Sequence, residues 1–407
     1  MKDAKYIRNL IFTTVMGGLM GVMNYAFNVI VARYTDSSVF STFSASMAFI
    51  YLLQIPSAAV ILTVTKIVGE NRKYDLERFK WRILLIFSVM GAISSALFFL
   101  FRTGFANIAS IPLESIIYLA IILLISFISP ISKGLLLGRE RIYAYNIIVL
   151  AETILKLGMG IVAIKLGGSI PLLILSNCLP ALLTTIVIYP LIRVKGEEKK
   201  EKIAINYKHF LLIAVSFLLM NMPYTLDLIL VNPGFRADYS AVSLLGKIVY
   251  FAATTIASVM FARLANQTDP KAERKTMIIA ILGTLFIGLG LTLGIFVLGD
   301  WVITWTIGEK YLSVAPYVGI FGLCMTGYAV VYMLANYFIS INRYTYIYIL
   351  LVVSALQVYL FKTYNGSLTQ VLNNQIVVYG LLTVLTLGYL FIILAKKRNG
   401  QKEDKAR

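Results

Sequence analysis

Charged residues are scarce in this sequence. They make up 14% of its 407 residues, whereas 59% of the residues are hydrophobic. Soluble proteins are about one quarter charged, and they need that polar material to cover their surface. The composition therefore excludes an ordinary soluble protein and indicates a chain whose surface meets lipid.

Side chains for metal binding and covalent catalysis are also few. The single histidine, His209, stands at the start of an expected helix, and Cys178 and Cys324, the two cysteines, lie in apolar runs. Zinc sites need three or four ligands, and buried cysteines of this kind usually serve in packing. The sequence has no nucleotide-binding loop. We therefore expect no enzyme activity, no bound metal and no cofactor other than a coupling ion, Na⁺ or H⁺.

What the sequence has instead is a series of long apolar runs. Each is about 18 to 25 residues, which as a helix crosses roughly 30 Å of hydrocarbon. We predict an all-α integral membrane protein with about twelve transmembrane helices. They are expected at 9–32, 40–65, 82–101, 112–133, 144–165, 169–192, 208–231, 239–262, 276–299, 312–338, 344–362 and 374–395.

The net charge of +18 has a regular distribution. Most Lys and Arg residues fall in alternate connections between the expected helices. This is the pattern of cytoplasmic loops in membrane proteins, so we expect no nucleic-acid partner. It predicts that both termini are cytoplasmic in a multi-pass protein of a bacterial or archaeal cell membrane.

A charged linker divides the expected helices into two sets of six. We expect an N-terminal bundle at 1–192, a cytoplasmic basic linker at 193–207, a C-terminal bundle at 208–395 and a cytoplasmic basic tail at 396–407. Aligned without gaps, the two halves place Asn28 on Asp227, Ser41 on Ser240 and Ser44 on Ser243. Because six is an even number, the halves would be parallel repeats, as in some secondary transporters.

Three stretches of the sequence are distinctive. They are VARYTDSSVFSTFSAS at 31–46, the stretch at 133–167 that begins KGLLLGRER, and the stretch at 227–265 that begins DLILVNPGFRADYS. They resemble the oligosaccharide flippase (polysaccharide transporter) family of the multidrug/oligosaccharidyl-lipid/polysaccharide exporter superfamily. The resemblance implies two six-helix bundles around a central cavity. It also implies movement of an isoprenoid-diphosphate-linked oligosaccharide from the cytoplasmic to the outer leaflet.

Ionisable residues within the expected helices are rare. Each costs about 2.5–3.5 kcal/mol at the membrane centre, so it usually faces a partner or a cavity. Glu152 and Lys156 stand four residues apart, on one face of an expected helix. They form either a structural ion pair or a cavity pair that opens when a diphosphate approaches Lys156.

A second pair lies in the C-terminal half. Asp227 and Lys247 fall in adjacent expected helices of opposite direction, at depths that differ by about 6 Å. They are expected to be close enough for a structural ion pair, and Lys247 is also a candidate for substrate binding. The alternative is that Asp227 binds the coupling ion, with Asn28 as its neutral counterpart in the other half.

Other candidate residues lie at the outer ends and inside the helices. Arg33 and Arg236 fall on the outer rim, where they either attract an emerging diphosphate or anchor in the membrane interface. Asn28 is a candidate for binding sugar hydroxyls or a neighbouring helix. The candidate hinges are Pro56, Pro180 and Pro223, because proline removes a backbone hydrogen bond.

These observations predict a flippase for a lipid-linked oligosaccharide that works by alternating access with an ion gradient. The expected partners are the substrate, membrane lipid and glycan-assembly enzymes, and the protein is expected to be a monomer. The main alternative is a multidrug/toxin extrusion-type exporter of organic cations, which has the same topology. A membrane-embedded glycan polymerase or ligase is disfavoured by the short external loops, and a scramblase or structural membrane subunit would not depend on an ion gradient.

Overall fold

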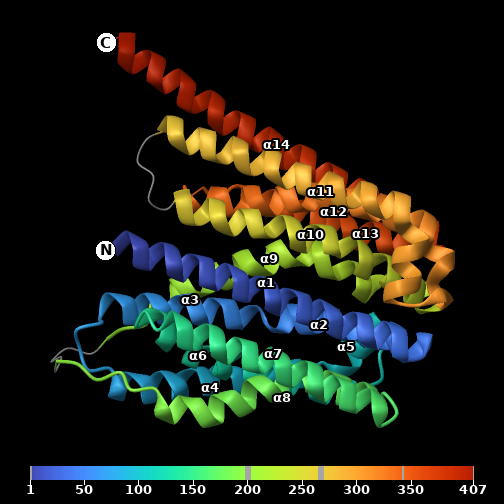
Figure 1. Ribbon diagram of the computed structural model, residues 1–407, viewed down its shortest axis with the longest axis horizontal. Helices are drawn as coiled ribbons and strands as arrows, with labels where there is room; N and C mark the ends of the chain where they lie inside the picture. Colours follow the sequence, from blue (N-terminus) through green and yellow to red (C-terminus); the bar gives the residue numbers. More distant parts are fainter. Residues whose placement is uncertain (1, 198–202, 265–269, 342, 407) are drawn as a thin grey trace. The chain divides into compact units, whose positions relative to one another are not determined.

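The chain folds into helices arranged in two compact units. The structure, a computed structural model, describes residues 2–197, 203–264, 270–341 and 343–406. The units are Met1–Asn221 and Met222–Arg407, which we call unit 1 and unit 2. The path of the chain through each unit can be followed in Figure 1.

Unit 1 holds the helices of the N-terminal half. They are α1 (Lys2–Tyr34), α2 (Ser37–Leu53), α3 (Ile55–Glu70), α4 (Glu77–Leu100), α5 (Arg102–Ala109), α6 (Ser115–Gly138), α7 (Ile142–Lys165), α8 (Ile170–Ile188) and η1 (Tyr189–Leu191). The boundary between the units falls inside α9 (Tyr207–Leu230), beyond the predicted linker at 193–207. The start of α9 is tied to unit 1 because the rings of Phe87 and Phe210 lie 5.5 Å apart.

Unit 2 contains the end of α9 and the helices that follow it. They are η2 (Pro233–Phe235), α10 (Arg236–Leu264), α11 (Pro270–Thr306), η3 (Glu309–Val314), α12 (Ala315–Ser340), α13 (Tyr346–Thr363) and α14 (Leu368–Ala406). Non-helical backbone at Leu298 kinks α11. The break falls one residue before 299, where the sequence predicted the end of this helix, and a second helical segment continues to Thr306.

The protein is a multi-pass membrane protein. Within the described residues, 11 helices are long and apolar enough to cross a membrane, and α2 and α3 together form one of them. The less apolar α10 is not among these 11, although it has 29 residues and packs against α11 and α12. With α10 as a further crossing, the helices agree with the twelve that the sequence predicted.

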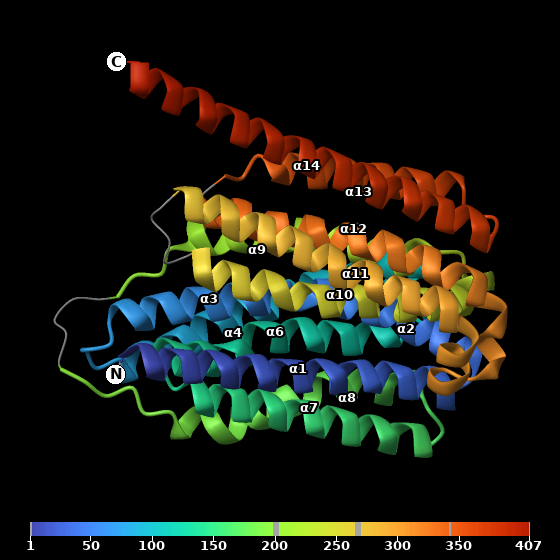
Figure 2. The same ribbon diagram turned by 45° about the horizontal axis from the view of Figure 1, so that its top comes forward.

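The two units share one pattern of helix packing. In unit 1, α6 packs against α3, α4 and α8, and α7 packs against α8. In unit 2, α12 packs against α10, α11 and α14, and α13 packs against α14. With α2 and α3 counted as one crossing, α6 and α12 are each the fourth crossing of their half. These four packing pairs of unit 1 thus have counterparts in unit 2, as a parallel repeat would give, whereas the packing of α1 on α7 has no equally close counterpart between α9 and α13. The helices of each unit can be followed in Figure 2.

The three prolines predicted as hinges lie at the start of one helix and inside two others. The second crossing breaks at Gln54, and Pro56 stands in the first turn of α3, where a missing N–H is tolerated. Pro180 lies inside α8 and Pro223 inside α9. Pro130 inside α6 is a further interruption, which was not predicted. Their role as hinges stays a prediction.

The first residues of the predicted linker dock onto unit 1. The carbonyl oxygen of Val194 accepts hydrogen bonds from the Leu76 N–H, at 2.9 Å, and from the Arg139 guanidinium, at 2.7 Å. The Glu197 carbonyl accepts a 2.7 Å bond from the Asp75 N–H, and Val194 itself is buried. This part of the linker is therefore structurally part of unit 1.

Two glycines of α6 set its distance from α3. A Cβ atom on Gly134 would lie 2.7 Å from the Val64 Cβ, and one on Gly138 would lie 2.5 Å from the Val68 Cβ. Small residues four apart allow helices to approach closely in membranes. We expect Gly134→Ala with Gly138→Ala to lower the thermal unfolding midpoint by several degrees, since overpacking costs about 1–3 kcal/mol.

The matched control is Gly158→Ala in α7, because an added Cβ there meets nothing within 4 Å. Its unfolding midpoint is expected to stay at or above that of the wild type, since alanine favours helix more than glycine does. Unfolding of the purified protein in detergent is the measurement. Equal midpoints for the double variant and the control would contradict the close packing of α3 on α6.

Candidate functional site

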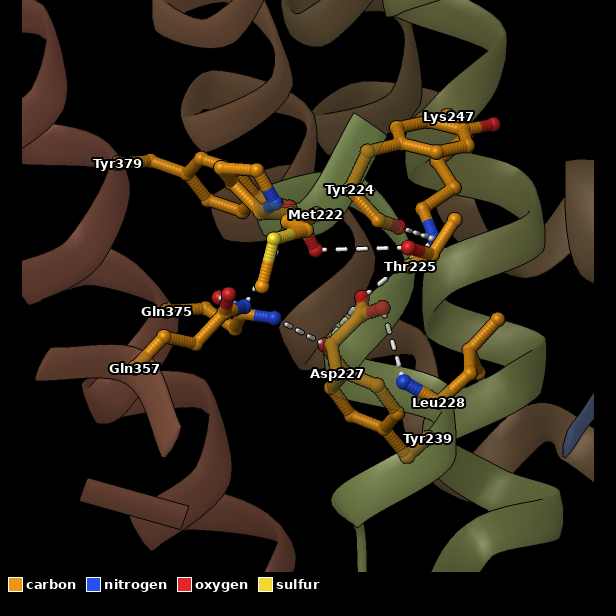
Figure 3. Close-up of polar contacts among 11 residues, drawn as sticks. Met222, Tyr224, Thr225, Asp227, Leu228, Tyr239, Lys247, Gln357, Gln375 and Tyr379 are labelled. Carbon is orange, nitrogen blue, oxygen red and sulfur yellow. Dashed lines mark hydrogen bonds and ion pairs between the residues drawn. The ribbon is translucent and has the colours of Figure 1, made fainter. Parts of the chain in front are cut away.

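A network of buried polar groups is built around the proline of α9. Pro223 has no N–H, and its own carbonyl oxygen accepts hydrogen bonds from Gln357 Nε2, at 3.0 Å, and from the Tyr379 hydroxyl, at 2.9 Å. The next carbonyl, that of Tyr224, accepts a 2.9 Å bond from Lys247 Nζ. Side chains of α10, α13 and α14 thus converge on the backbone of one turn of α9 (Figure 3).

Asp227 lies one turn further along α9, at the centre of the network. Its Oδ1 accepts a 2.8 Å hydrogen bond from the Leu228 N–H, and its Oδ2 accepts one of 2.9 Å from the Tyr239 hydroxyl. Lys247 Nζ lies 3.4 Å from the same Oδ2. Asp227 has no exposed surface and Lys247 has 5%. The predicted pairing of these two residues is therefore present as a buried ion pair with further hydrogen-bond donors.

Two glutamines extend the network away from the ion pair. Gln375 Nε2 donates to the Tyr239 hydroxyl at 2.9 Å, and Gln357 Nε2 lies 3.2 Å from Gln375 Oε1. Both side chains are fully buried, and Gln357 Oε1 has no hydrogen-bond partner among the described residues. Sequence reasoning missed both. The only signal in the sequence was a glutamine within an apolar stretch, which is weak until its partners are known.

Tyrosines surround the ion pair on one side. The Tyr250 ring lies 5.1 Å from the Tyr224 ring, 5.3 Å from the Tyr328 ring and 5.6 Å from the Tyr332 ring, measured between centroids. The Lys247 ammonium lies 4.2 Å from the Tyr224 ring centroid. A cation near an aromatic face gains about 2 kcal/mol when both are removed from water. The aromatic rings therefore help to hold the ammonium in place.

The predicted ion pair of Glu152 with Lys156 in unit 1 is wrong. Glu152 Oε2 lies 2.7 Å from Lys133 Nζ, on α6, and its Oε1 accepts a 2.6 Å bond from the Thr184 hydroxyl, on α8. Residues four apart share a face of a helix, but that face is wide enough to meet different neighbours. Glu152 points to α6 and α8, and Lys156 points to α1.

Lys156 has neutral partners. Its Nζ donates a 3.0 Å hydrogen bond to Asn24 Oδ1 and lies 4.9 Å from the centroid of the Phe27 ring. Gly160, one turn further along α7, admits that ring because a Cβ there would collide with it. None of the ion pairs within the described parts of the chain includes Lys156. The α1–α7 interface thus holds a part-buried ammonium without a carboxylate.

The other predicted site residues lie apart from these two clusters. Asn28 donates to the Asn24 carbonyl at 2.9 Å, one turn from the Lys156 contact. Arg33 is exposed at the end of α1, as a rim residue should be. Arg236 is instead buried, and its guanidinium donates to the Val231 carbonyl at 2.9 Å. Arg236 has the predicted place at the start of α10, but the expectation of an accessible guanidinium is wrong because the side chain folds back to the Val231 carbonyl.

No family model and no curated protein matches the chain. Among solved structures, the lipid II flippase MurJ in an inward closed conformation aligns with a TM-score of 0.73 and 14% identity, covering 93% of this chain and 87% of that one. An inward-facing multidrug resistance MATE family transporter of the MOP superfamily aligns with a TM-score of 0.70 and 14% identity, covering 93% and 96%.

The chain has the MOP transporter fold. A further member, a MOP superfamily transporter from Pyrococcus furiosus Vc1 whose binding pocket is described as having reverse polarity, has a TM-score of 0.59 and 13% identity, covering 96% and 95%. The comparisons confirm the all-α membrane fold, which is the fold that the sequence resemblance implied. At such low identity they concern the fold, so the substrate of this MOP-fold protein has to be argued from its side chains.

The ion pair of unit 2 is expected to show strong energetic coupling. Asp227→Asn alone leaves the Lys247 ammonium without a carboxylate, and the loss of one partner of a buried pair costs about 3–5 kcal/mol. Asp227→Asn with Lys247→Met removes both charges and should recover much of that loss. Unfolding midpoints of the single and double variants in detergent measure the coupling.

Lys165→Gln is the control, because Lys165 is exposed in the last turn of α7. It is expected to leave the midpoint within a degree or two of the wild type, since exposed charges contribute about 0–1 kcal/mol. If the losses of the two single variants simply add in the double variant, Asp227 and Lys247 do not form an energetically coupled pair.

Proposed function

We propose that the protein is a flippase that moves a lipid-linked oligosaccharide with an anionic diphosphate group across the membrane by alternating access. The observation that carries this proposal is the Lys156 ammonium, which is held by an amide oxygen and an aromatic ring. A lysine at membrane depth is costly without a counter-charge. A bound diphosphate would supply that charge.

The position of Lys156 suits this role. It stands nine residues before the end of α7 at Lys165, which is about 14 Å along the helix axis. That depth is far from the membrane surface, where lysine side chains reach water by extending outward. Lysine binds phosphate as a flexible point charge. A diphosphate entering next to α1 and α7 would gain an ionic contact without having to break an existing ion pair.

The acidic residues at membrane depth argue against an exporter of organic cations. Such an exporter needs an available carboxylate. Glu152 is bonded to Lys133 and Thr184, and Asp227 is bonded to Lys247 and Tyr239. A cationic substrate would have to displace a lysine from either site. The charge balance therefore supports the flippase over the MATE-type alternative, although both share the fold.

The protein acts in a cell membrane with both termini in the cytoplasm, as a monomer, alongside glycan-assembly enzymes. Alternating access would use the interrupted helices at Pro56, Pro180 and Pro223 as hinges. Asp227 and its network are the place where an ion gradient would act on this cycle. The resemblance to oligosaccharide flippases and the likeness to MurJ support this setting.

Lys156→Ala is expected to lower the rate of flipping roughly tenfold, which corresponds to about 1.4 kcal/mol of lost substrate interaction. Lys156→Arg keeps the charge and should retain much of the rate. The measurement uses the purified protein in liposomes with a fluorescent undecaprenyl-diphosphate-linked glycan, and it follows loss of fluorescence when a membrane-impermeant reductant is added.

Two controls make this test specific. Lys165→Ala removes an exposed lysine from the same helix and should leave the rate unchanged. Cells that produce the wild-type protein should gain no resistance to cationic dyes. A normal flipping rate in well-folded Lys156→Ala would remove Lys156 from the mechanism, and dye resistance that depends on Asp227 or Glu152 would favour the exporter of organic cations.

A further inference from the structure

In the ion pair of unit 2, the Lys247 ammonium lies among oxygen atoms of the kinds that bind a monovalent cation. The Lys247 ammonium lies 2.9 Å from the Tyr224 carbonyl oxygen and 3.4 Å from Asp227 Oδ2. A carboxylate, backbone carbonyls and a hydroxyl are the oxygen ligands that hard cations take in proteins. Here those oxygens gather around a turn of α9 at full burial, and the cation among them belongs to a side chain (Figure 3).

The charges at this site already sum to zero. Asp227 contributes one negative charge and Lys247 one positive charge. Among the described groups of the network, the other members are neutral: Tyr239, Gln357, Gln375 and the carbonyl oxygens of α9. A metal ion beside Lys247 would place a second positive charge in a buried site that holds one carboxylate. The cost of removing that ion from water would then have no compensation.

The wider network also retains an acceptor that is not used. Gln357 Oε1 is buried without a hydrogen-bond partner among the described residues. The orientation of this amide is consistent with its surroundings, because Nε2 donates to the Pro223 carbonyl and lies 3.2 Å from Gln375 Oε1. Unsatisfied buried acceptors are uncommon and costly. The network therefore offers more oxygen atoms than its own donors fill.

We propose that Lys247 is a tethered cation that fills a latent monovalent cation site at Asp227, so that the wild-type protein binds no Na⁺ there and the site takes Na⁺ once Lys247 is replaced by a neutral side chain. The role of this site in transport rests on the proposed function, but ion binding at Asp227 does not. The sequence left Na⁺ and H⁺ as candidate coupling ions. Na⁺ has no vacant binding site at Asp227, because Lys247 fills it. A proton needs no vacant ion-binding site.

Lys247→Met is the informative variant. Methionine resembles the lysine stem in length and lacks the ammonium, so the change leaves Asp227 unpaired beside a space of about the size of an ion. An ion that binds only the folded state raises the unfolding midpoint in proportion to its occupancy. The full-length proteins are purified in detergent and unfolded in NaCl, KCl or choline chloride of the same concentration, so that screening is equal in all three.

The expected results differ between the proteins. The wild type should show the same midpoint in all three salts. Lys247→Met should gain about 2–4 °C in NaCl over choline chloride, with saturation as NaCl is raised. Lys247→Met with Asp227→Asn should lose that gain. Lys156→Met in unit 1 is the matched control, and it should show no Na⁺-specific gain because no carboxylate contacts Lys156 in the described structure.

Either of two results would overturn the proposal. One is a saturable Na⁺-specific gain in the wild type that Asp227→Asn abolishes. The other is a folded Lys247→Met protein whose midpoint is the same in NaCl and choline chloride. If Lys247→Met does not fold, Lys247→Gln is measured instead, with the same expected results. The wild-type comparison of the three salts tests the proposal in either case. No substrate is present in these experiments, so failure of the flippase proposal would appear only in the liposome assay.

Discussion

A charge buried at membrane depth has to be neutralised, and this constraint organises both units. Each carboxylate is neutralised from within the chain: Glu152 by Lys133, and Asp227 by Lys247. Lys156 contacts only neutral groups among its described partners, an amide oxygen and an aromatic ring, so its charge is not neutralised in this way. The lysine side chains therefore outnumber their acidic partners by one. Because one of these lysines has no acidic partner, a ligand that neutralises it has to be negatively charged.

The buried network of unit 2 exists because one helix presents its backbone to side chains. Pro223 lacks a donor, and the carbonyl oxygens of Pro223 and Tyr224 receive bonds from three other helices. Such bonds tie α10, α13 and α14 to the same turn of α9. A movement of this turn would have to break several of them together. Asp227, one turn away, is thus placed where its charge state affects the packing of all four helices.

The sequence predicted the fold well because the membrane dictates much of it. Helix lengths follow from the thickness of the hydrocarbon, and the less apolar α10 is long enough to complete the set. The pairing of Asp227 with Lys247 was also predictable, since both the direction and the depth of adjacent helices follow from topology. The sequence assigns each residue to a helix and to a depth in the membrane. Those two assignments were sufficient to predict that Asp227 and Lys247 pair.

The errors have one common cause, which is that spacing does not say which neighbour a helix face meets. Glu152 and Lys156 share a face of α7, yet α6 and α8 take one and α1 takes the other. Arg236 lies at the predicted end of the membrane, but its side chain turns inward to the Val231 carbonyl. Gln357 was missed because uncharged residues in an apolar helix carry little signal until their partners are known.

The sign of the unmatched charge matters because this fold is shared by carriers of different substrates. Structures described as a lipid II flippase and as multidrug resistance transporters align with this chain at similar scores, so helix arrangement cannot separate the two activities. Electrostatics can separate them, because a buried carboxylate already bound to lysine has lost most of its attraction for a cationic drug. An ammonium held by neutral groups keeps its attraction for an anion. Among the three lysines at membrane depth discussed above, the one without a carboxylate partner in the described structure is Lys156, and the physical argument for a diphosphate substrate follows from that residue.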